Sequence, residues 1–128
     1  MKLLLDTHTY LWALTDADRL SPTASQVIAD PSNQLHLSIA SLWEATIKLA
    51  SGKLKVPGQS VEFLVQQLGP AGVAIIPITP DHLRVLESLP RLHGDPFDRI
   101  LLCQSLVEQM PIISTDTALR RYQANILW

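Results

Sequence analysis

The stretch Lys2-Leu3-Leu4-Leu5-Asp6-Thr7 contains a short apolar run of three leucines that is followed directly by an aspartate. Its length and its flanks predict a buried strand over residues 2–5. Near the other end of the chain, Ile112-Ile113-Ser114 runs in the same way into Thr115-Asp116. The sequence therefore predicts two buried strands that each lead directly to an acidic residue.

Between these two runs, strand patterns alternate with helix patterns. Strands are predicted at residues 2–5, 34–37, 73–76, 111–114 and 125–128, and helices at residues 7–14, 22–30, 39–51, 60–68, 80–89, 95–110 and 118–122. Because the strands are apolar throughout rather than alternating, burial on both faces is indicated. The pattern predicts one α/β domain over residues 1–128, with a mainly parallel sheet of about four to five strands flanked by helices.

Helical periodicity and turn residues add further detail. The inward stripe of the helix at residues 39–51 is predicted to be Ile39, Leu42, Trp43, Thr46, Ile47 and Ala50. In the helix at residues 80–89, Leu83, Leu86 and Leu89 are predicted to face inward. The pair Gly69-Pro70 is predicted to end the helix that precedes it.

The composition limits the class of protein. A length of 128 residues suits one domain, and 17% charged residues argue against disorder. The single cysteine, Cys103, excludes an internal disulfide framework and a cysteine-rich zinc site. We expect a cytoplasmic protein without membrane contact, because a free thiol fits a reducing compartment and no apolar run has the length of a signal or membrane segment. The net charge of −2 neither suggests nor excludes a nucleic acid substrate.

Four acidic side chains are expected at one edge of the sheet. Ligands of such sheets bind beyond the carboxyl ends of the strands, so Asp6 and Asp116 would point into one crevice. Glu44 and Asp98 lie in the first turns of two predicted helices and can face the same crevice. Like charges about 4 Å apart repel by about 4 kcal/mol at an effective dielectric of about 20, so such a cluster either protonates or holds a cation. Oxygen ligands select Mg²⁺ or Mn²⁺, which can activate water for phosphodiester hydrolysis.

Each acid also has a purely structural interpretation. Asp6 and Asp116 could cap the helices that follow them. Glu44 stands four residues before Lys48, which is the spacing of an ordinary surface ion pair. Only the combination of the acids, on strand ends far apart in the chain, favours a metal site.

The third acidic position is ambiguous because it holds two aspartates. Asp95, Pro96 and Asp98 together are similar to a capping box with proline at the first helical position. Asp95 is therefore predicted to be a helix cap first and a metal ligand second.

The full set of motifs resembles the PIN domain family and, within it, the VapC toxins of toxin–antitoxin pairs. The resemblance covers essentially the whole chain. It rests on four segments in order, at residues 3–7, 38–44, 93–99 and 114–116. Their sequences are Leu3-Leu4-Leu5-Asp6-Thr7, Ser38-Ile39-Ala40-Ser41-Leu42-Trp43-Glu44, His93-Gly94-Asp95-Pro96-Phe97-Asp98-Arg99 and Ser114-Thr115-Asp116.

The resemblance implies a Mg²⁺- or Mn²⁺-dependent endoribonuclease that is held inactive by an antitoxin encoded by the adjacent gene. Its catalytic and metal-binding residues would be Asp6, Glu44, Asp98 and Asp116. Asp98 is preferred to Asp95 as the ligand, because the residues after it match the helix of the family's third motif. Thr115 resembles the family's Ser/Thr before the last aspartate, which helps to orient the site. Members are often dimeric, so a homodimer is also expected.

Several neighbouring residues have two interpretations each. Lys48 could reach a phosphate of the substrate, or could only pair with Glu44. Arg99 could contact RNA backbone or orient a carboxylate, or be a plain surface arginine. His8 is a weak candidate base with a structural alternative, and His93 is interpreted as a loop residue.

The aromatic residues could stack on bases or fill the core. These residues are Trp12, Trp43, Phe63 and Trp128. Core packing is predicted for Trp43, which lies on the inward stripe of its helix. Trp12, together with Leu11 and Leu14, could line a groove for an antitoxin helix, with the core as the alternative. Cys103 is predicted to be buried and inert.

Three other functions compete with this interpretation. An apolar strand that leads to Asp-Thr is similar to the haloacid dehalogenase phosphatases, but their second aspartate would fall at position 8, which is His8. A PIN-like domain that binds RNA or protein without cleavage is a second alternative. A DNA nuclease is the third, because the same metal chemistry attacks either backbone.

Overall fold

The computed structural model describes residues 1–122 and 124–128, and within them a five-stranded parallel sheet in the order β3-β2-β1-β4-β5. The strands are β1 (Lys2–Leu5), β2 (Gln34–Ser38), β3 (Val73–Ile76), β4 (Ile112–Ile113) and β5 (Ile126–Leu127). All four strand pairings are parallel, which confirms the predicted α/β class. The last two strands are shorter than predicted.

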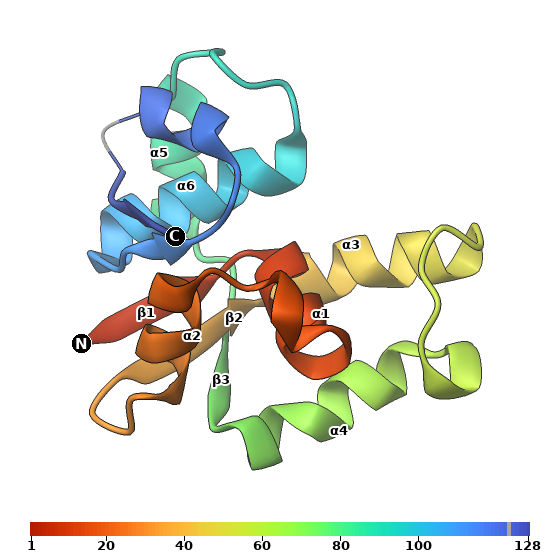
Figure 1. The fold of residues 1–128 in the computed structure, drawn as a ribbon. Coiled ribbons are helices and arrows are strands. Elements are labelled where there is room, and N and C mark those ends of the chain that lie inside the picture. Colours follow the sequence, from red (N-terminus) through yellow and green to blue (C-terminus); the bar gives the residue numbers. More distant parts are fainter. Residues whose placement is uncertain (123) are drawn as a thin grey trace.

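Helices cover both faces of this sheet (Figure 1). The α-helices are α1 (Thr7–Thr15), α2 (Pro22–Ala29), α3 (Ile39–Ala50), α4 (Val61–Ala71), α5 (Pro80–Ser88) and α6 (Pro96–Glu108). The 3₁₀ helices are η1 (Ala17–Arg19), η2 (Pro57–Gln59) and η3 (Thr117–Arg121). None of the helices among the described residues combines the length and hydropathy that crossing a membrane requires.

The central strand β1 divides the core into two layers. Leu3 and Leu5 pack with side chains of α1, α2, α3 and α4, whereas Leu4 packs with side chains of α6 and η3 on the opposite face. All three leucines are at most 1% exposed, so the predicted burial of both faces is confirmed for this strand. The edge strand β3 departs from that prediction, because its Ile75 is 44% exposed.

The register brings the ends of β1 and β4 together. Leu5 pairs with Leu37 on one side and with Ile113 on the other. The amide of Asp6 continues the ladder and donates to the carbonyl of Ile113 at 3.1 Å. The residues that follow β1 and β4 are therefore neighbours at the carboxyl edge of the sheet.

The predicted inward stripe of α3 is wrong. Of its members only Leu42 is buried, whereas Trp43 is 61% exposed and Ile47 is 48% exposed. The buried side chains are instead Ala40, Ser41, Leu42, Glu44, Ala45 and Leu49. The reason is that α3 contacts α1, α4 and α6, so its covered surface is wider than one apolar stripe and also takes in small and polar residues, whereas Ile39, Trp43 and Ile47 lie on the uncovered face.

In α5 the prediction is confirmed for Leu86 and Leu89, which are partly buried and pack against the core, but it is wrong for Leu83. Leu83 was expected to face inward but is 51% exposed, while the neighbouring His82 is fully buried. The ring of His82 accepts a hydrogen bond from the amide of Thr79 at 2.9 Å, and its Nε2 lies 3.0 Å from Glu108 of α6. These two partners stabilise a polar side chain that is fully buried directly before Leu83.

The end of α4 also differs from the prediction. The helix continues through Gly69 and Pro70 and ends at Gly72, which has a left-handed backbone with φ of 69°. Glycine adopts this conformation without a steric penalty, and its amide bonds to the carbonyls of the last turn. The helix therefore ends at the residue that can turn back, two positions after the proline.

Candidate metal centre

Asp6 and Ser114 lie side by side at the carboxyl edge of the sheet. Asp6 follows β1 and is 6% exposed, and its carboxylate Oδ2 accepts a hydrogen bond from the Ser114 hydroxyl at 2.6 Å. The same hydroxyl oxygen accepts from the amide of Asp116 at 3.0 Å. Asp6 makes no side-chain cap of α1, so the capping interpretation does not apply to it. Ser114 thus joins the first and last acids of the predicted set.

Ser114 is a residue that the sequence analysis missed. The sequence favours Thr115, which directly precedes Asp116, but Thr115 is exposed at a bend. The signal for Ser114 is the strand register, since Leu5 pairs with Ile113 and the next residues, Asp6 and Ser114, then lie side by side.

Glu44 comes to the site from α3. It is 6% exposed, which is unusual for a carboxylate and differs from the solvated side chain of an ordinary surface pair. Its Oε2 accepts from Lys48 at 2.9 Å, so the ion pair that the spacing indicates is present. Its charge also contributes to raising the pKa of Asp6, although burial of Asp6 is the largest cause. Glu44 therefore belongs to the acidic cluster and to the ion pair together.

The structure separates the roles of Asp95 and Asp98. Asp95 is the N-cap of α6, where its Oδ1 accepts from the amides of Phe97 at 2.8 Å and of Asp98 at 3.2 Å. The carboxylate of Asp98 lies on the inner side of the helix, with its Oδ2 2.8 Å from Nε2 of His93. Burial raises the pKa of Asp98 to about 7, and the negative charges of Asp6 and Asp95 act in the same direction.

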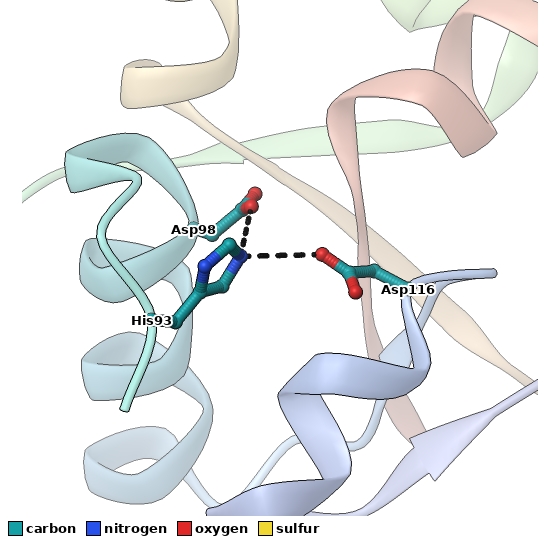
Figure 2. Close-up of side chains that lie close together, drawn as sticks. All are labelled: His93, Asp98 and Asp116. Carbon is teal, nitrogen blue, oxygen red and sulfur yellow. Dashed lines mark hydrogen bonds and ion pairs between the residues drawn. The ribbon is translucent and has the colours of Figure 1, made fainter. Parts of the chain in front are cut away.

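His93 lies between two of the acids (Figure 2). Its Nε2 is 2.8 Å from Oδ2 of Asp98 and 3.3 Å from Oδ2 of Asp116. The other oxygen of Asp116 accepts from the amide of Ala118, so this aspartate caps η3 and faces the site as well. Within residues 1–122 and 124–128, one ligand atom from each of His93, Asp98 and Asp116 lies within 4.8 Å of the others. The sequence analysis missed His93 because it falls in a loop, although it stands inside the third motif.

The loop that carries His93 is held by Tyr122. The Tyr122 hydroxyl accepts from the amides of Leu92 at 3.0 Å and His93 at 2.9 Å, and donates to the carbonyl of Pro90 at 2.8 Å. Arg99 also donates to the Pro90 carbonyl, at 2.9 Å. Since the guanidinium of Arg99 is engaged with loop backbone, the geometry favours its role in supporting the loop over contact with a substrate.

The donor set fits a divalent cation. Among the described residues, the carboxylates of Asp98 and Asp116 lie in one ligand group with His93, whereas Asp6 and Glu44 lie outside that group. The charge of Glu44 acts on Asp6 and that of Asp6 on Asp98, and burial raises the pKa of both Asp6 and Asp98. Such shifts mean that the surrounding protein favours the uncharged acid, so the ionised cluster gains most from an added positive charge. Oxygen ligands of this kind suit Mg²⁺ or Mn²⁺.

Comparison with known proteins identifies the family of the chain. The family profile described as the PIN domain matches residues 3–125. The chain belongs to the PIN domain family. The residues of this PIN chain that match the family profile include all four acids, from Asp6 after the first strand to Asp116 in the last turn.

Relatives of this PIN chain include Ribonuclease VapC22 of Mycobacterium tuberculosis, which is 27% identical over 122 residues and matches 94% of this chain and 92% of that protein. VapBC2 from Rickettsia felis, solved bound to a DNA fragment from its promoter, has a TM-score of 0.75 at 14% identity and covers 98% of this chain and 97% of the other. A toxin–antitoxin complex from Klebsiella pneumoniae has a TM-score of 0.66 at 17% identity, with 97% and 94% covered.

The remaining predicted positions are also placed. Trp12 is half-buried, with its ring centroid 6.0 Å from that of Trp128 and the guanidinium carbon of Arg19 4.4 Å from its centre. Trp43, predicted to fill the core, instead makes an edge contact with Phe97 at 5.1 Å on the surface. Cys103 is buried as predicted, and burial raises the pKa of its thiol.

Proposed function

We propose that this PIN domain is a Mg²⁺- or Mn²⁺-dependent endoribonuclease that acts as the toxin of a toxin–antitoxin pair. The observation that carries the proposal is that Asp98 and Asp116 share one ligand group with His93, while the charges of the buried Asp6 and Glu44 act next to it at the carboxyl edge of the sheet. Asp6, Glu44, Asp98 and Asp116 are the catalytic and metal-binding residues. The ribonuclease name of the relative from M. tuberculosis supports the reaction, and the toxin–antitoxin complex from K. pneumoniae supports the biological role.

Other residues of the chain position the catalytic acids or offset their charge. A divalent cation held by these acids would supply an activated water and would stabilise negative charge on the phosphate. Ser114 fixes the carboxylate of Asp6 by its 2.6 Å hydrogen bond, and Lys48 offsets the charge of Glu44 at 2.9 Å. Asp95 holds the first turn of α6 and thereby fixes the direction of Asp98.

A basic cleft beside the acids supports a nucleic acid substrate. It encloses about 460 Å³ and is lined by His8, Leu11, Trp12, Thr15, Asp16, Arg19, Lys48, Lys53 and Leu54. Lys48 joins this cleft to the acidic site through its ion pair with Glu44. Cationic side chains attract the phosphate backbone and aromatic rings stack on bases, so a single strand is the substrate form that this surface suits.

The test is cleavage by the purified chain. Labelled single-stranded RNA and DNA of the same sequence are incubated with Mg²⁺, with Mn²⁺ and with EDTA. We expect metal-dependent cleavage of RNA that Asp6→Asn and Asp116→Asn abolish, while Asp81→Asn, at an exposed position of α5, cleaves normally. Cleavage of RNA by the Asp6→Asn and Asp116→Asn variants at the wild-type rate would contradict the proposal. Cleavage of DNA alone would support the DNA nuclease, and binding of RNA without cleavage would support the non-catalytic domain.

We infer two protein partners for this chain. One is an antitoxin encoded by the adjacent gene, and the check is growth arrest on expression of the chain alone with recovery when the neighbouring product is co-expressed. The cytoplasm is the compartment in which both products would meet. If the neighbouring product gave no recovery, the toxin role would be withdrawn while the nuclease could stand.

The second inferred partner is another copy of the chain. Ile39, Trp43 and Ile47 form an exposed apolar stripe at spacings of four residues along α3. The stripe adjoins an apolar pocket of about 210 Å³ whose lining includes Leu83 and Phe97. Two identical stripes without charged residues can pack across a two-fold axis without repulsion, which supports a homodimer through α3.

A further inference from the structure

We propose that His93 is a direct ligand of the bound cation, so that the centre has a mixed nitrogen and oxygen donor set. Nε2 of His93 and carboxylate oxygens of Asp98 and Asp116 supply three donors of that set (Figure 2), in addition to the acids Asp6 and Glu44 of the proposed site. The proposal deepens the proposed function, on which it rests, by naming the class of cation. A centre with an imidazole ligand binds divalent transition metals such as Mn²⁺ in preference to Mg²⁺.

The distances fit one shared ion. The ligands of an octahedral cation stand about 2.1 Å from it, which places adjacent ligands about 3 Å from each other. Nε2 of His93 is 2.8 Å from the Asp98 oxygen and 3.3 Å from the Asp116 oxygen, so the two separations lie on either side of this value. The His93 nitrogen is therefore spaced as a neighbouring ligand of each aspartate oxygen without rearrangement of the chain.

The fold itself places the imidazole. Tyr122 holds the amide of His93 at 2.9 Å, and it and Arg99 both donate to the carbonyl of Pro90 at the start of the same loop. The side chains of His93, Asp98 and Asp116 are 23%, 18% and 33% exposed. The site is thus open enough for an ion to enter, and its ligands are fixed from behind by hydrogen bonds.

The competing interpretation gives His93 no contact with the ion. In that case the imidazole only hydrogen-bonds to Asp98 and Asp116 and orients them, as an outer partner of a carboxylate site does. The two interpretations differ in whether a histidine nitrogen is bonded to the metal, which pulsed electron paramagnetic resonance of bound Mn²⁺ measures directly. This readout does not depend on nuclease activity.

The experiment uses the full chain and Mn²⁺ alone. We expect the electron spin-echo spectrum of the wild-type protein to contain the ¹⁴N modulation of a coordinated imidazole, and ¹⁵N-labelled histidine to replace it by the ¹⁵N pattern. His93→Asn should lose the modulation and bind Mn²⁺ about tenfold or more weakly, with a smaller change for Mg²⁺. His8→Asn, beside Asp6, and His36→Asn, in β2, are matched histidine controls and should keep both. The isotope result holds even if His93→Asn folds poorly.

The possible results separate the two proposals. Bound Mn²⁺ that shows no histidine nitrogen would overturn the role of His93 and leave the carboxylate site intact. Nitrogen coupling that His8→Asn removes would also overturn it, because the ligand would then be the other histidine. Failure of the wild-type chain to bind Mn²⁺ would overturn both this inference and the metal-dependent function.

Discussion

The Ser114 hydroxyl donates a 2.6 Å hydrogen bond to the carboxylate of Asp6, across 108 positions of sequence. Both groups are almost fully buried, with 1% of Ser114 and 6% of Asp6 exposed. The bond exists because β1 and β4 are adjacent and in parallel register. The position of the Asp6 carboxylate therefore depends on the pairing of β1 with β4.

Replacement of Ser114 should damage both the site and the fold. Ser114→Ala leaves a buried carboxylate and the amide of Asp116 without their partner, so the free energy of unfolding should fall by about 1–3 kcal/mol and metal should bind more weakly. Denaturant titration and calorimetric Mn²⁺ titration are the measurements. Thr115→Ala, at the exposed neighbour, is the control and should change stability by less than about 0.5 kcal/mol. A larger loss of stability and of metal affinity in Thr115→Ala than in Ser114→Ala would assign the orienting role to Thr115.

Metal affinity should rise with pH up to neutrality. The pKa of Asp98 is raised to about 7 by burial and by the charges of Asp6 and Asp95, so at pH 6 this carboxyl carries a proton that a cation must displace. The apparent affinity should increase by up to about tenfold per pH unit below 7 and level off above it. Calorimetry in buffers of different ionisation enthalpy should detect proton release at pH 6. Asp98→Asn should lose that release, and its persistence would assign the proton elsewhere.

The same pKa has a consequence for the metal-free fold. Between about pH 4 and pH 7 the folded chain holds a proton on Asp98 that the unfolded chain has lost. The contribution of this group to stability is therefore present at low pH and is lost as pH rises toward 7. Thermal unfolding in EDTA should show this fall in stability for the wild-type chain, and Asp98→Asn should show a flatter pH dependence. Identical profiles for the two proteins would contradict the assignment.

Loss of the Tyr122 hydroxyl should loosen the loop that carries His93. Tyr122→Phe removes three hydrogen bonds to the loop backbone while keeping the ring in the core, so we expect a decrease of about 1–3 kcal/mol in the free energy of unfolding. Amide hydrogen exchange should become faster at Leu92 and His93. Tyr10→Phe, whose hydroxyl bonds to Leu64 on the other face of the sheet, should destabilise without this local effect. Unchanged exchange in Tyr122→Phe would deny the positioning role.

Charge removal from the basic cleft should weaken RNA binding. Arg19→Gln with Lys53→Gln should lower the affinity for single-stranded RNA, measured in EDTA so that no cleavage occurs. The slope of log affinity against log salt should decrease by about 1.4, at about 0.7 for each phosphate of a single strand that the protein no longer neutralises. Lys2→Gln with Arg84→Gln removes the same charge from outside the cleft and should leave the slope nearly unchanged. An equal decrease in the two double variants would show that only net charge matters.

A charge on the apolar stripe of α3 should dissociate the homodimer. Trp43 is 61% exposed, so Trp43→Glu should leave the monomer folded and shift sedimentation from dimer to monomer. Val65→Glu places the same charge at an exposed apolar position of α4 and should remain dimeric. A wild-type chain that sediments as a monomer at high concentration would contradict the homodimer and leave the stripe to another partner.

Local sequence was sufficient for the order and type of the main elements and for the position of Asp6 and Asp116 after two strands. Three features are present as predicted: the strand at residues 2–5, the helix start at Pro96 with its N-cap, and the parallel sheet. They could be predicted because strand burial and helix capping depend on neighbouring residues. Asp6 and Asp116 were located by the strands that precede them. Asp95 was interpreted as a cap from its spacing to Pro96, and its hydrogen bonds confirm this.

Tertiary structure decided how these elements are turned toward one another. Periodicity gives a helix an apolar face but not the number of neighbours that cover it, and for this reason Trp43 and Ile47 were wrongly placed inside. The contacts of Ser114 with Asp6 and of His93 with Asp116 depend on strand register and on a loop held by Tyr122. Sequence therefore determined which acids the chain offers, whereas packing determined that a serine and a histidine join them, since both contacts arise between residues far apart in the chain.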